Sequence, residues 1–177
     1  MDFVKEKNKL SVKDLVESAL LIALVYIATA FINIRLPIVA NGGLVHLGTV
    51  MLIVSALVFG SKKGAIAGAF GMGLFDLLSG WTSWAPFTFI VRGIMGFVIG
   101  KIAYAKGKEG NSILLNVLAI IIGSIVMIAG YYVTEIILYG NWLAPISSIP
   151  GNITQDVVGL ILGIPLAKVL KRYSRYF

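Results

Sequence analysis

Long apolar segments recur along the whole of this 177-residue chain, and they limit its fold more than any other feature. Runs of about 18 or more apolar residues can cross a hydrocarbon core roughly 30 Å thick as a helix. Only 13% of the residues are charged, against roughly a quarter in a soluble domain. The chain is therefore predicted to be an all-α membrane protein, one integral membrane domain over residues 1–177 built as a six-transmembrane-helix bundle. The expected helices are about 12–31, 45–59, 64–78, 86–104, 112–138 and 152–170.

Polar segments rich in glycine and proline separate these helices and supply signals for their ends. Ser11 precedes the first helix as an N-cap, with Asp14 three residues later. Gly60-Ser61-Lys62-Lys63 has the composition of a tight turn, and Pro86 takes a favoured first helical position. The fifth helix is longer than the bilayer core requires, so we expect it to tilt or protrude.

Basic residues alternate with helix number, which predicts the orientation of the bundle. Of the fifteen lysines and arginines, thirteen fall on one side of a six-helix bundle: Lys5, Lys7, Lys9, Lys13, Lys62, Lys63, Lys101, Lys106, Lys108, Lys168, Lys171, Arg172 and Arg175. The positive-inside rule places that side, with both chain termini, in the cytoplasm. A net charge of +7 could suggest nucleic acid, but a nucleic-acid patch would not follow helix order in this way, so no nucleic-acid partner is expected.

The first 30 residues have a second interpretation. A basic start, an apolar run and Ala28-Thr29-Ala30 resemble a signal peptide with a cleavage site, although the apolar run is long for one.

Ionisable residues within or beside the apolar segments fall in the outer half of the predicted bundle. They are Arg35, His46, Asp76, Arg92, Glu135 and Asp156. Arg92 comes six residues after Pro86, which is about 9 Å along a helix. The inner halves are almost purely apolar or small, apart from Asp14 and Glu17. A proton or ion path needs polar groups at several depths, so this distribution favours a cup open to the outside over a channel.

The charged groups of this cup have two interpretations. An arginine in hydrocarbon is costly unless it is paired or lines a wet cavity. Arg92 either pairs with Asp76 or Glu135 to lock helices together, or some of these groups contact a polar ligand. Both interpretations can hold at once.

Aromatic and amide residues gather at the same end, and they too have alternatives. The aromatic residues are Trp81, Trp84, Trp142, Tyr131, Tyr132 and Tyr139. An interfacial belt explains most of them, while one or two rings, especially Trp84, would suit stacking on a flat heteroaromatic ligand. Asn152 and Gln155 either cap the last helix or read ring nitrogens and hydroxyls.

Small residues at four-residue spacing allow close contact between helix backbones. They are Ala19-x-x-x-Ala23, Gly64-x-x-x-Gly68, Gly96-x-x-x-Gly100 and Gly159-x-x-x-Gly163. Internal packing is the favoured interpretation of the glycine pairs, and the alanine pair could face another protein.

Catalytic and metal-binding patterns are absent from the sequence. There is no cysteine and one histidine, which excludes cysteine and multi-histidine metal sites, and no cofactor is expected. No nucleophile–base set supports an intramembrane enzyme that uses Asp76 or Glu135. There is no P-loop, so a partner must supply the energy if the chain concentrates a solute.

Four segments carry a family resemblance: Gly43-Leu-Val-His-Leu-Gly48, Phe59-Gly60-Ser-Lys-Lys-Gly64, Phe75-Asp76-Leu-Leu-Ser79 and Ala85-Pro-Phe-Thr-Phe-Ile-Val-Arg-Gly93. With Ala19-x-x-x-Ala23, the size and the six predicted spans, the chain resembles the substrate-binding S components of energy-coupling factor (ECF) vitamin transporters. The segments are similar to the riboflavin-type subfamily, which includes carriers for pyridoxine and hydroxymethylpyrimidine.

The resemblance implies a multi-pass protein of the bacterial cell membrane, not an enzyme, that binds a vitamin near the outer surface under a lid formed by loop 1, residues 33–44. It implies docking through the first three helices on a transmembrane coupling subunit attached to two ATPase subunits, followed by toppling to deliver the ligand inside. Ala19 and Ala23 would then belong to the docking face. The expected pocket residues are His46, Asp76, Trp84, Arg92, Tyr131, Glu135, Asn152 and Gln155.

The expected ligand is of the pyridoxine or hydroxymethylpyrimidine class, with riboflavin as the alternative. A structural membrane subunit without a ligand is the other alternative.

Overall fold

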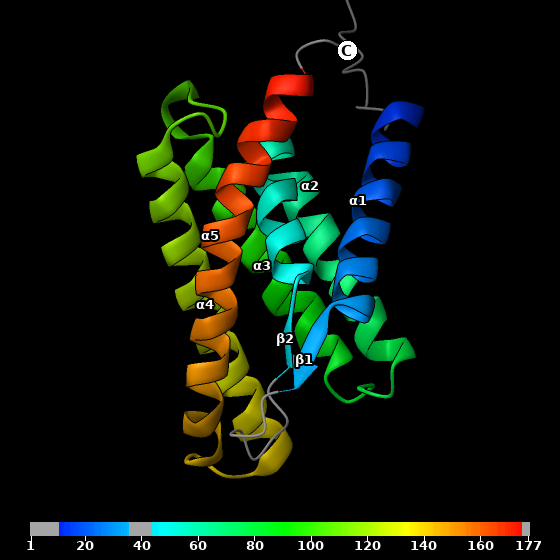
Figure 1. The fold of residues 1–177 in the computed structure, drawn as a ribbon. Coiled ribbons are helices and arrows are strands. Elements are labelled where there is room, and N and C mark those ends of the chain that lie inside the picture. The colour runs from blue at the N-terminus through cyan, green and yellow to red at the C-terminus, as the bar shows by residue number, and fades with distance from the viewer. Residues whose placement is uncertain (1–10, 36–43, 175–177) are drawn as a thin grey trace, which may run out of the picture.

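The computed structural model describes residues 11–35 and 44–174, and these form a helical bundle with a small two-stranded sheet at one end (Figure 1). Five of the described helices are long and apolar enough to cross a membrane, which agrees with an all-α membrane protein. The elements are α1 (Val12–Phe31), β1 (Asn33–Arg35), β2 (Leu44–His46), α2 (Gly48–Leu78), α3 (Ala85–Ala103), η1 (Ala105–Gly107), α4 (Ile113–Tyr139), η2 (Ala144–Ser148) and α5 (Ile149–Ser174).

Helix α2 reverses direction at Gly60. This residue has φ 83° and ψ −173°, a conformation that residues with a Cβ rarely adopt. A Cβ added at Gly64 would lie 2.6 Å from the Cβ of Ala56, and one added at Gly68 would lie 2.5 Å from Leu52. Each of these pairs is symmetric about Gly60, so the two halves of α2 run antiparallel. The turn predicted at 60–63 is thus a reversal within one helical element, and the expected helices 45–59 and 64–78 are joined there.

Glycines at the predicted four-residue spacing allow the two halves of α2 to pack closely on their neighbours. A Cβ at Gly96 of α3 would collide with the backbone of Gly64, and one at Gly100 would lie 2.5 Å from the Cα of Ser61. On α5, a Cβ at Gly163 would lie 2.8 Å from the Ile53 side chain. The interpretation of these glycines as internal packing residues is confirmed.

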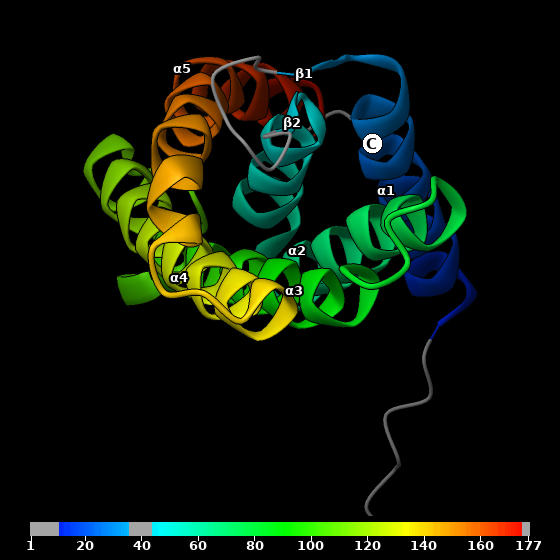
Figure 2. The same cartoon turned by 90° about the horizontal axis from the view of Figure 1, so that it is seen from below.

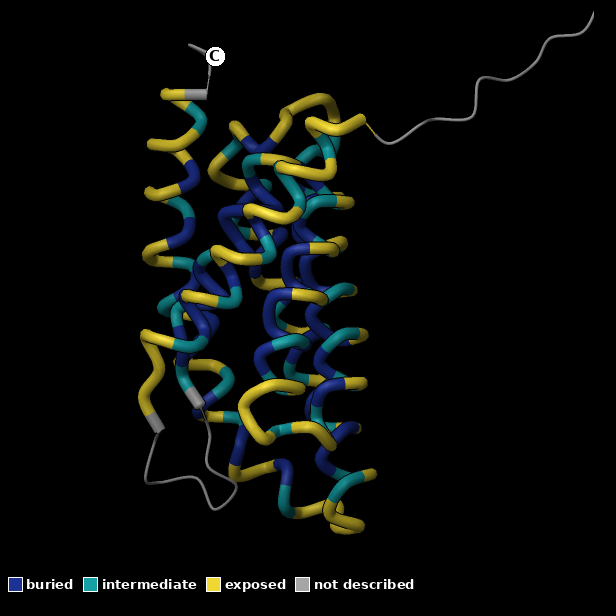
Figure 3. Tube along the Cα trace, turned by 90° about the vertical axis from the view of Figure 1, so that its right-hand side faces the viewer, coloured by how far each residue is buried: buried dark blue, intermediate teal, exposed yellow. Residues whose placement is uncertain are grey.

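The first half of α2 lies in the middle of the bundle, as the view from the strand end shows (Figure 2). Its side chains Leu52, Ile53 and Leu57 are fully buried. The other helices alternate buried and exposed residues along their length (Figure 3). Exposed large apolar side chains on α1, α4 and α5 are expected for helices that face lipid.

Two expected helix starts are wrong. Val45 and His46 lie in β2, which pairs antiparallel with β1 so that His46 faces Asn33 across the sheet. Strands of three residues are too short to produce a recognisable alternation. The last helix begins at Ile149 and not at 152, because Pro150 falls in its first turn, where a missing N–H costs little. Most of loop 1, the predicted lid, lies outside the described residues.

The N-terminal end of α1 and the C-terminal end of α5 lie at the end of the bundle opposite the strands (Figure 1). Here Lys63, at the reversal of α2, pairs with Glu17 of α1. The Tyr104 hydroxyl, after α3, donates to the carbonyl of Val58 at 2.6 Å. These contacts join three segments at what we call the basic end, and the opposite end is called the strand end.

Candidate functional site

The reversal at Gly60 determines which residues meet at the strand end. Thr49 is the second residue of α2 and Asp76 lies near its end; a straight helix would hold them about 40 Å apart. With the chain folded back, both reach the level of the first turns of α3, the last turns of α4 and the start of α5. Polar side chains from all four helices converge there around Arg92.

Arg92 is the centre of this cluster and is only 3% exposed. Its Nε donates to the Tyr131 hydroxyl at 3.1 Å, and its Nη1 donates to the Thr49 hydroxyl at 3.2 Å. The guanidinium also lies 5.1 Å from the centre of the Tyr131 ring, within the range of a cation–π interaction. These contacts provide part of the compensation that a buried cation requires.

Thr49 connects Arg92 to α5. Its hydroxyl oxygen also accepts from Nε2 of Gln155 at 2.6 Å, and both residues are buried. One hydroxyl of α2 therefore bonds to α3 and α5 together, which holds the amide of Gln155 beside the guanidinium of Arg92.

Thr88 connects Asp76 to the same cluster. Its hydroxyl donates to the Asp76 carboxylate and lies 3.3 Å from the Tyr131 hydroxyl. Asp76 and Arg92 are thus linked through two hydroxyl groups. The positive charge of Arg92 also interacts electrostatically with the carboxyl groups of Asp76 and Asp156.

Two side chains of the cluster have buried polar atoms without a hydrogen-bond partner among the described residues: Nδ1 of His46 and both carboxylate oxygens of Asp156. Ser124 lies close enough to act on the Asp156 carboxyl, but no hydrogen bond of ordinary geometry forms. Buried polar atoms are rarely left unpaired in native proteins, because each costs about 1–3 kcal/mol. They mark the cluster as a place where a polar ligand would complete the bonding.

His46 contributes a neutral imidazole. Burial, to which the charge of Arg92 adds, lowers the pKa of His46 to about 3. A Cβ at Gly48 would lie 2.9 Å from Nδ1 of His46, so glycine at that position leaves room for the ring. A neutral imidazole offers one donor and one acceptor to a ligand.

An aromatic group lies beside the polar cluster. Trp84, the N-cap of α3, has its ring 6.1 Å from the rings of both Tyr131 and Tyr139 and 6.5 Å from that of Trp81. A hollow of about 310 Å³ opens at this turn, lined in part by Trp81, Trp84 and Tyr139. Trp142 is 71% exposed.

The structure brings most of the predicted pocket residues together. His46, Asp76, Arg92, Tyr131 and Gln155 take part in the cluster, and Trp84 contacts Tyr131. These positions are consistent with the predicted roles. That these residues contact a ligand stays a prediction.

Four other predicted residues, two for the pocket and two for the docking face, lie outside the bonds described above. Glu135 is buried one turn from Tyr131 and accepts from the Ser148 hydroxyl at 2.8 Å. Asn152 is half-buried in the first turn of α5, and none of the cluster bonds within 11–35 and 44–174 includes it. Ala19 and Ala23 are exposed on α1.

Sequence reasoning did not select Thr49, Thr88 and Asp156 as pocket residues. Threonine hydroxyls in helices usually bond their own backbone, so nothing in the sequence separates Thr49 from other helical threonines. Asp156 carried a signal, since it is an ionisable residue in an apolar helix beside the chosen Gln155. No group of three or more metal-ligating side chains occurs in the described part of the chain.

Comparison with known proteins gives one family and two relatives. The profile of the family described as ECF-type riboflavin transporter, S component, matches residues 9–172. An uncharacterized protein from Pyrococcus woesei is 34% identical over 139 residues, which is 78% of this chain and 90% of the relative. The thiamine precursor transporter HmpT of Lactococcus lactis subsp. cremoris (strain MG1363) is 28% identical over 172 residues, which is 97% of this chain and 94% of HmpT.

A solved structure has the same fold. It is the S component of a bacterial ECF transporter, with a TM-score of 0.69 at 23% identity, covering 91% of this chain and 96% of that one.

Proposed function

The chain belongs to the family of ECF-type riboflavin transporter S components, and from that premise we propose that it is the substrate-binding subunit of an ATP-driven importer for a small water-soluble vitamin or vitamin precursor. The family is one of membrane transport components and not of enzymes. The proposed site is the Arg92 cluster with the Trp84 aromatic group beside it.

The observation that carries this proposal is the set of unpaired polar atoms around a buried arginine. A cluster that served only to lock helices together would satisfy its own members. Here Nδ1 of His46 and the carboxylate of Asp156 are buried without hydrogen-bond partners among the described residues. Folding has already removed water from these atoms. A ligand that forms hydrogen bonds with them therefore binds without the free-energy cost of desolvating them.

The proposed substrate is a pyridine or pyrimidine compound with hydroxymethyl groups, of the pyridoxine or hydroxymethylpyrimidine class. The name of the relative HmpT, a thiamine precursor transporter, supports this class. So does the chemistry of the cluster, because an imidazole, an amide and carboxyl groups can bond ring nitrogens and hydroxyls. Trp84 would supply the face on which a flat ring stacks.

Riboflavin is the alternative substrate, supported by the family description. It is larger and carries a flexible ribityl chain, so it would have to extend from the Arg92 cluster toward the aromatic turn. A structural subunit without a ligand is the remaining alternative, and the unpaired atoms of the cluster argue against it.

Titration of the purified protein distinguishes these possibilities. The intrinsic tryptophan fluorescence is followed while hydroxymethylpyrimidine, pyridoxine, thiamine or riboflavin is added, because Trp84 would sense a bound ring. We expect one of the first two to bind at sub-micromolar concentration. Tight binding of riboflavin alone would establish the alternative substrate, and binding of none of the four would contradict a vitamin-binding role.

We further propose six membrane crossings, with both halves of α2 crossing and both termini in the cytoplasm of the cell. The distribution of lysine and arginine toward the basic end supports this orientation. The chain has no cysteine, so single cysteines can be introduced at Lys108 and Asn141. An impermeant maleimide should label the Asn141→Cys variant in intact cells and the Lys108→Cys variant only after lysis, and the reverse pattern would invert the topology.

The proposed partners are a transmembrane coupling subunit and two ATPase subunits. The chain lacks a P-loop, so ATP hydrolysis must occur elsewhere. The exposed face of α1 around Ala19 and Ala23 is the proposed docking surface, since small side chains there allow another helix to approach closely.

A further inference from the structure

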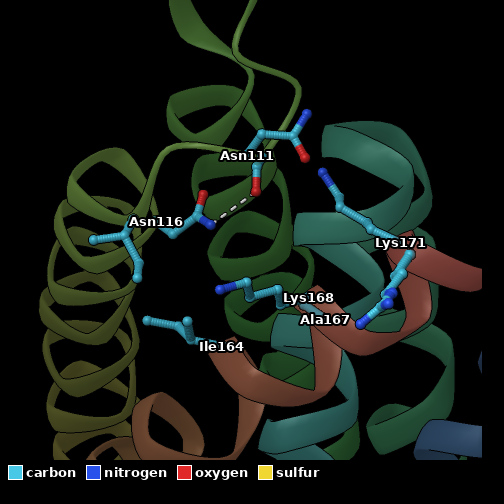
Figure 4. A pocket seen from close by; sticks show the side chains of 9 residues that line it. Asn111, Asn116, Ile164, Ala167, Lys168 and Lys171 are labelled. Atoms are coloured by element: carbon cyan, nitrogen blue, oxygen red, sulfur yellow. Dashed lines mark hydrogen bonds between the residues drawn. The ribbon is translucent and has the colours of Figure 1, made fainter.

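A polar cavity lies at the basic end of the bundle, far from Arg92. It has a volume of about 440 Å³ and lies between the residues that begin α4 and the last turns of α5 (Figure 4). Asn111, Asn116, Lys168, Lys171 and Arg172 give it its polar lining. The proposed function makes no use of this cavity.

Asn116 has a buried, unpaired acceptor. The residue is 6% exposed, and its Nδ2 donates to the carbonyl of Gly110 at 2.8 Å. This bond fixes the amide, and its Oδ1 has no partner among the described residues. Figure 4 shows the amide of Asn116 and the amino group of Lys168 at the same cavity. An occupant that donates a hydroxyl to Oδ1 would satisfy Asn116.

The charge of the lining selects an anion. Three cationic side chains line the cavity, and no lining residue in the described part of the chain is acidic. Lys171 is held in position, because its amino group donates to the backbone carbonyl of Glu109 and lies 5.3 Å from the centre of the Tyr104 ring. The carboxyl of Glu109 is the nearby acid, and it leaves the lining with an excess of positive charge.

An apolar crease continues from the cavity along α4 and α5. A second hollow, of about 210 Å³, is lined mostly by apolar residues at helical spacing on both helices, together with Ser124 and, toward its far end, Asp156 of the Arg92 cluster. The apolar residues include Ile120 and Ile128 on α4 and Ile153, Val157 and Leu160 on α5. The cavity itself is lined by Ile113 and Ile164, which lie on the same two stripes. One crease therefore combines a cationic end with a mostly apolar groove that extends to Asp156.

We propose that this crease binds an anionic phospholipid whose headgroup carries a hydroxyl, of the phosphatidylglycerol class. The phosphodiester lies among Lys168, Lys171 and Arg172, and a headgroup hydroxyl donates to Oδ1 of Asn116. An acyl chain lies along the crease between α4 and α5. The basic end is the end that the charge distribution assigns to the cytoplasmic leaflet, where anionic lipids attract lysine and arginine.

Native mass spectrometry of the purified full chain in detergent tests this assignment. The probes are phosphatidylglycerol, phosphatidylmethanol, phosphatidylcholine and inorganic phosphate. Phosphatidylmethanol has the same charge as phosphatidylglycerol but no headgroup hydroxyl. We expect the wild-type chain to retain phosphatidylglycerol more strongly than phosphatidylmethanol, and phosphatidylcholine least.

A matched pair of variants tests the location. The Lys168→Gln/Arg172→Gln variant should bind phosphatidylglycerol about tenfold more weakly, while Lys62→Gln/Lys101→Gln, which removes two exposed cations of the basic end outside the cavity, should bind like wild type. If both variants lost the same amount of phosphatidylglycerol binding, the lipid would be attracted only by the general surface charge of the basic end, and the proposed site would be wrong. If millimolar phosphate displaced the lipid, the cavity would be a site for a soluble anion, and the proposal of a bound lipid would be wrong. Equal retention of phosphatidylglycerol and phosphatidylmethanol by the wild-type chain would remove the role of Asn116, whatever the variants do.

Discussion

Arg92 is the residue on which the candidate site depends. It is a buried cation with bonds to three helices: its own α3, α2 through Thr49, and α4 through Tyr131. Removing one partner of a buried charge usually costs about 3–5 kcal/mol, because the remaining groups keep their desolvation cost. Arg92 therefore stabilises the fold as well as taking part in the proposed site, and substitutions of neighbouring residues that are less buried should separate the two roles.

Replacing Trp84 by alanine should weaken vitamin binding about tenfold, because the ring that stacks on the ligand is lost. The fold should persist, since Trp84 is only half-buried. Isothermal titration of the variant measures the effect. Trp142→Ala is the matched control, because that side chain is 71% exposed at the same end. Equal affinities of the two variants would remove Trp84 from the site.

His46 gives the protein a defined response to acid. Its pKa is lowered from 6.5 to about 3 in the fold by burial, with the charge of Arg92 adding to the effect. The neutral imidazole therefore stabilises the fold fully above pH 6.5, and this contribution is lost progressively as the pH falls toward 3.

The melting temperature should consequently fall more steeply between pH 7 and pH 4.5 in the wild-type chain than in the His46→Gln variant. The difference between the two curves isolates His46, because both chains share every carboxyl group. Parallel curves would show that His46 is not held neutral. Vitamin affinity should be independent of His46 titration between pH 6 and pH 8.

At the scale of elements, the helices could be predicted from the sequence, while the strands could not. Length and hydropathy specify where a chain crosses a membrane, and the first helix, 12–31, is confirmed at both ends. Ser11 caps it as expected, accepting from the backbone N–H of Asp14. The pairing of β1 with β2 depends on contacts between segments, which three-residue strands do not reveal in their own pattern.

The contact between α2 and α3 depends on glycine at one position and tolerates a side chain a turn away. A Cβ at Gly96 would collide with the backbone of Gly64, whereas a Cβ at Gly93 comes no closer than 3.3 Å to another side chain. Gly96→Ala should therefore destabilise the fold by about 1–3 kcal/mol, and Gly93→Ala should be close to neutral. Thermal unfolding of both variants in the same detergent checks this, and equal effects of the two substitutions would show that the close backbone approach at Gly96 does not limit the packing.

The exposed face of α1 should govern uptake without affecting binding. Ala19→Leu/Ala23→Leu adds bulk to the proposed docking surface, far from the Arg92 cluster, so transport by the complete importer should be lost while the vitamin affinity is retained. Ala129→Leu, at an exposed position on α4, is the control that should transport normally. Uptake of labelled vitamin into cells provides the measurement, and normal uptake by the α1 variant would move the docking surface elsewhere.

At the scale of the whole molecule, the depth of the ionisable residues already indicated at which end of the bundle polar side chains would gather. Asp76, Arg92 and Gln155 come from three helices that the sequence can place only by depth, and all three take part in one cluster. The roles of Thr49 and Thr88 could not be predicted, because they depend on which helix faces reach Arg92. That arrangement follows from the reversal at Gly60, whose sequence signal indicates a turn but not which residues meet across it.

The Arg92 cluster is proposed to be incomplete without a bound vitamin. Mass spectrometry of small molecules released from the protein, after purification from cells supplied with the vitamins, tests this most directly. The wild-type chain should release a heteroaromatic vitamin or precursor in stoichiometric amount, and a folded Arg92→Gln variant should release little or none. Equal amounts from both chains, or no small molecule from a folded wild-type chain that also binds none in solution, would contradict it.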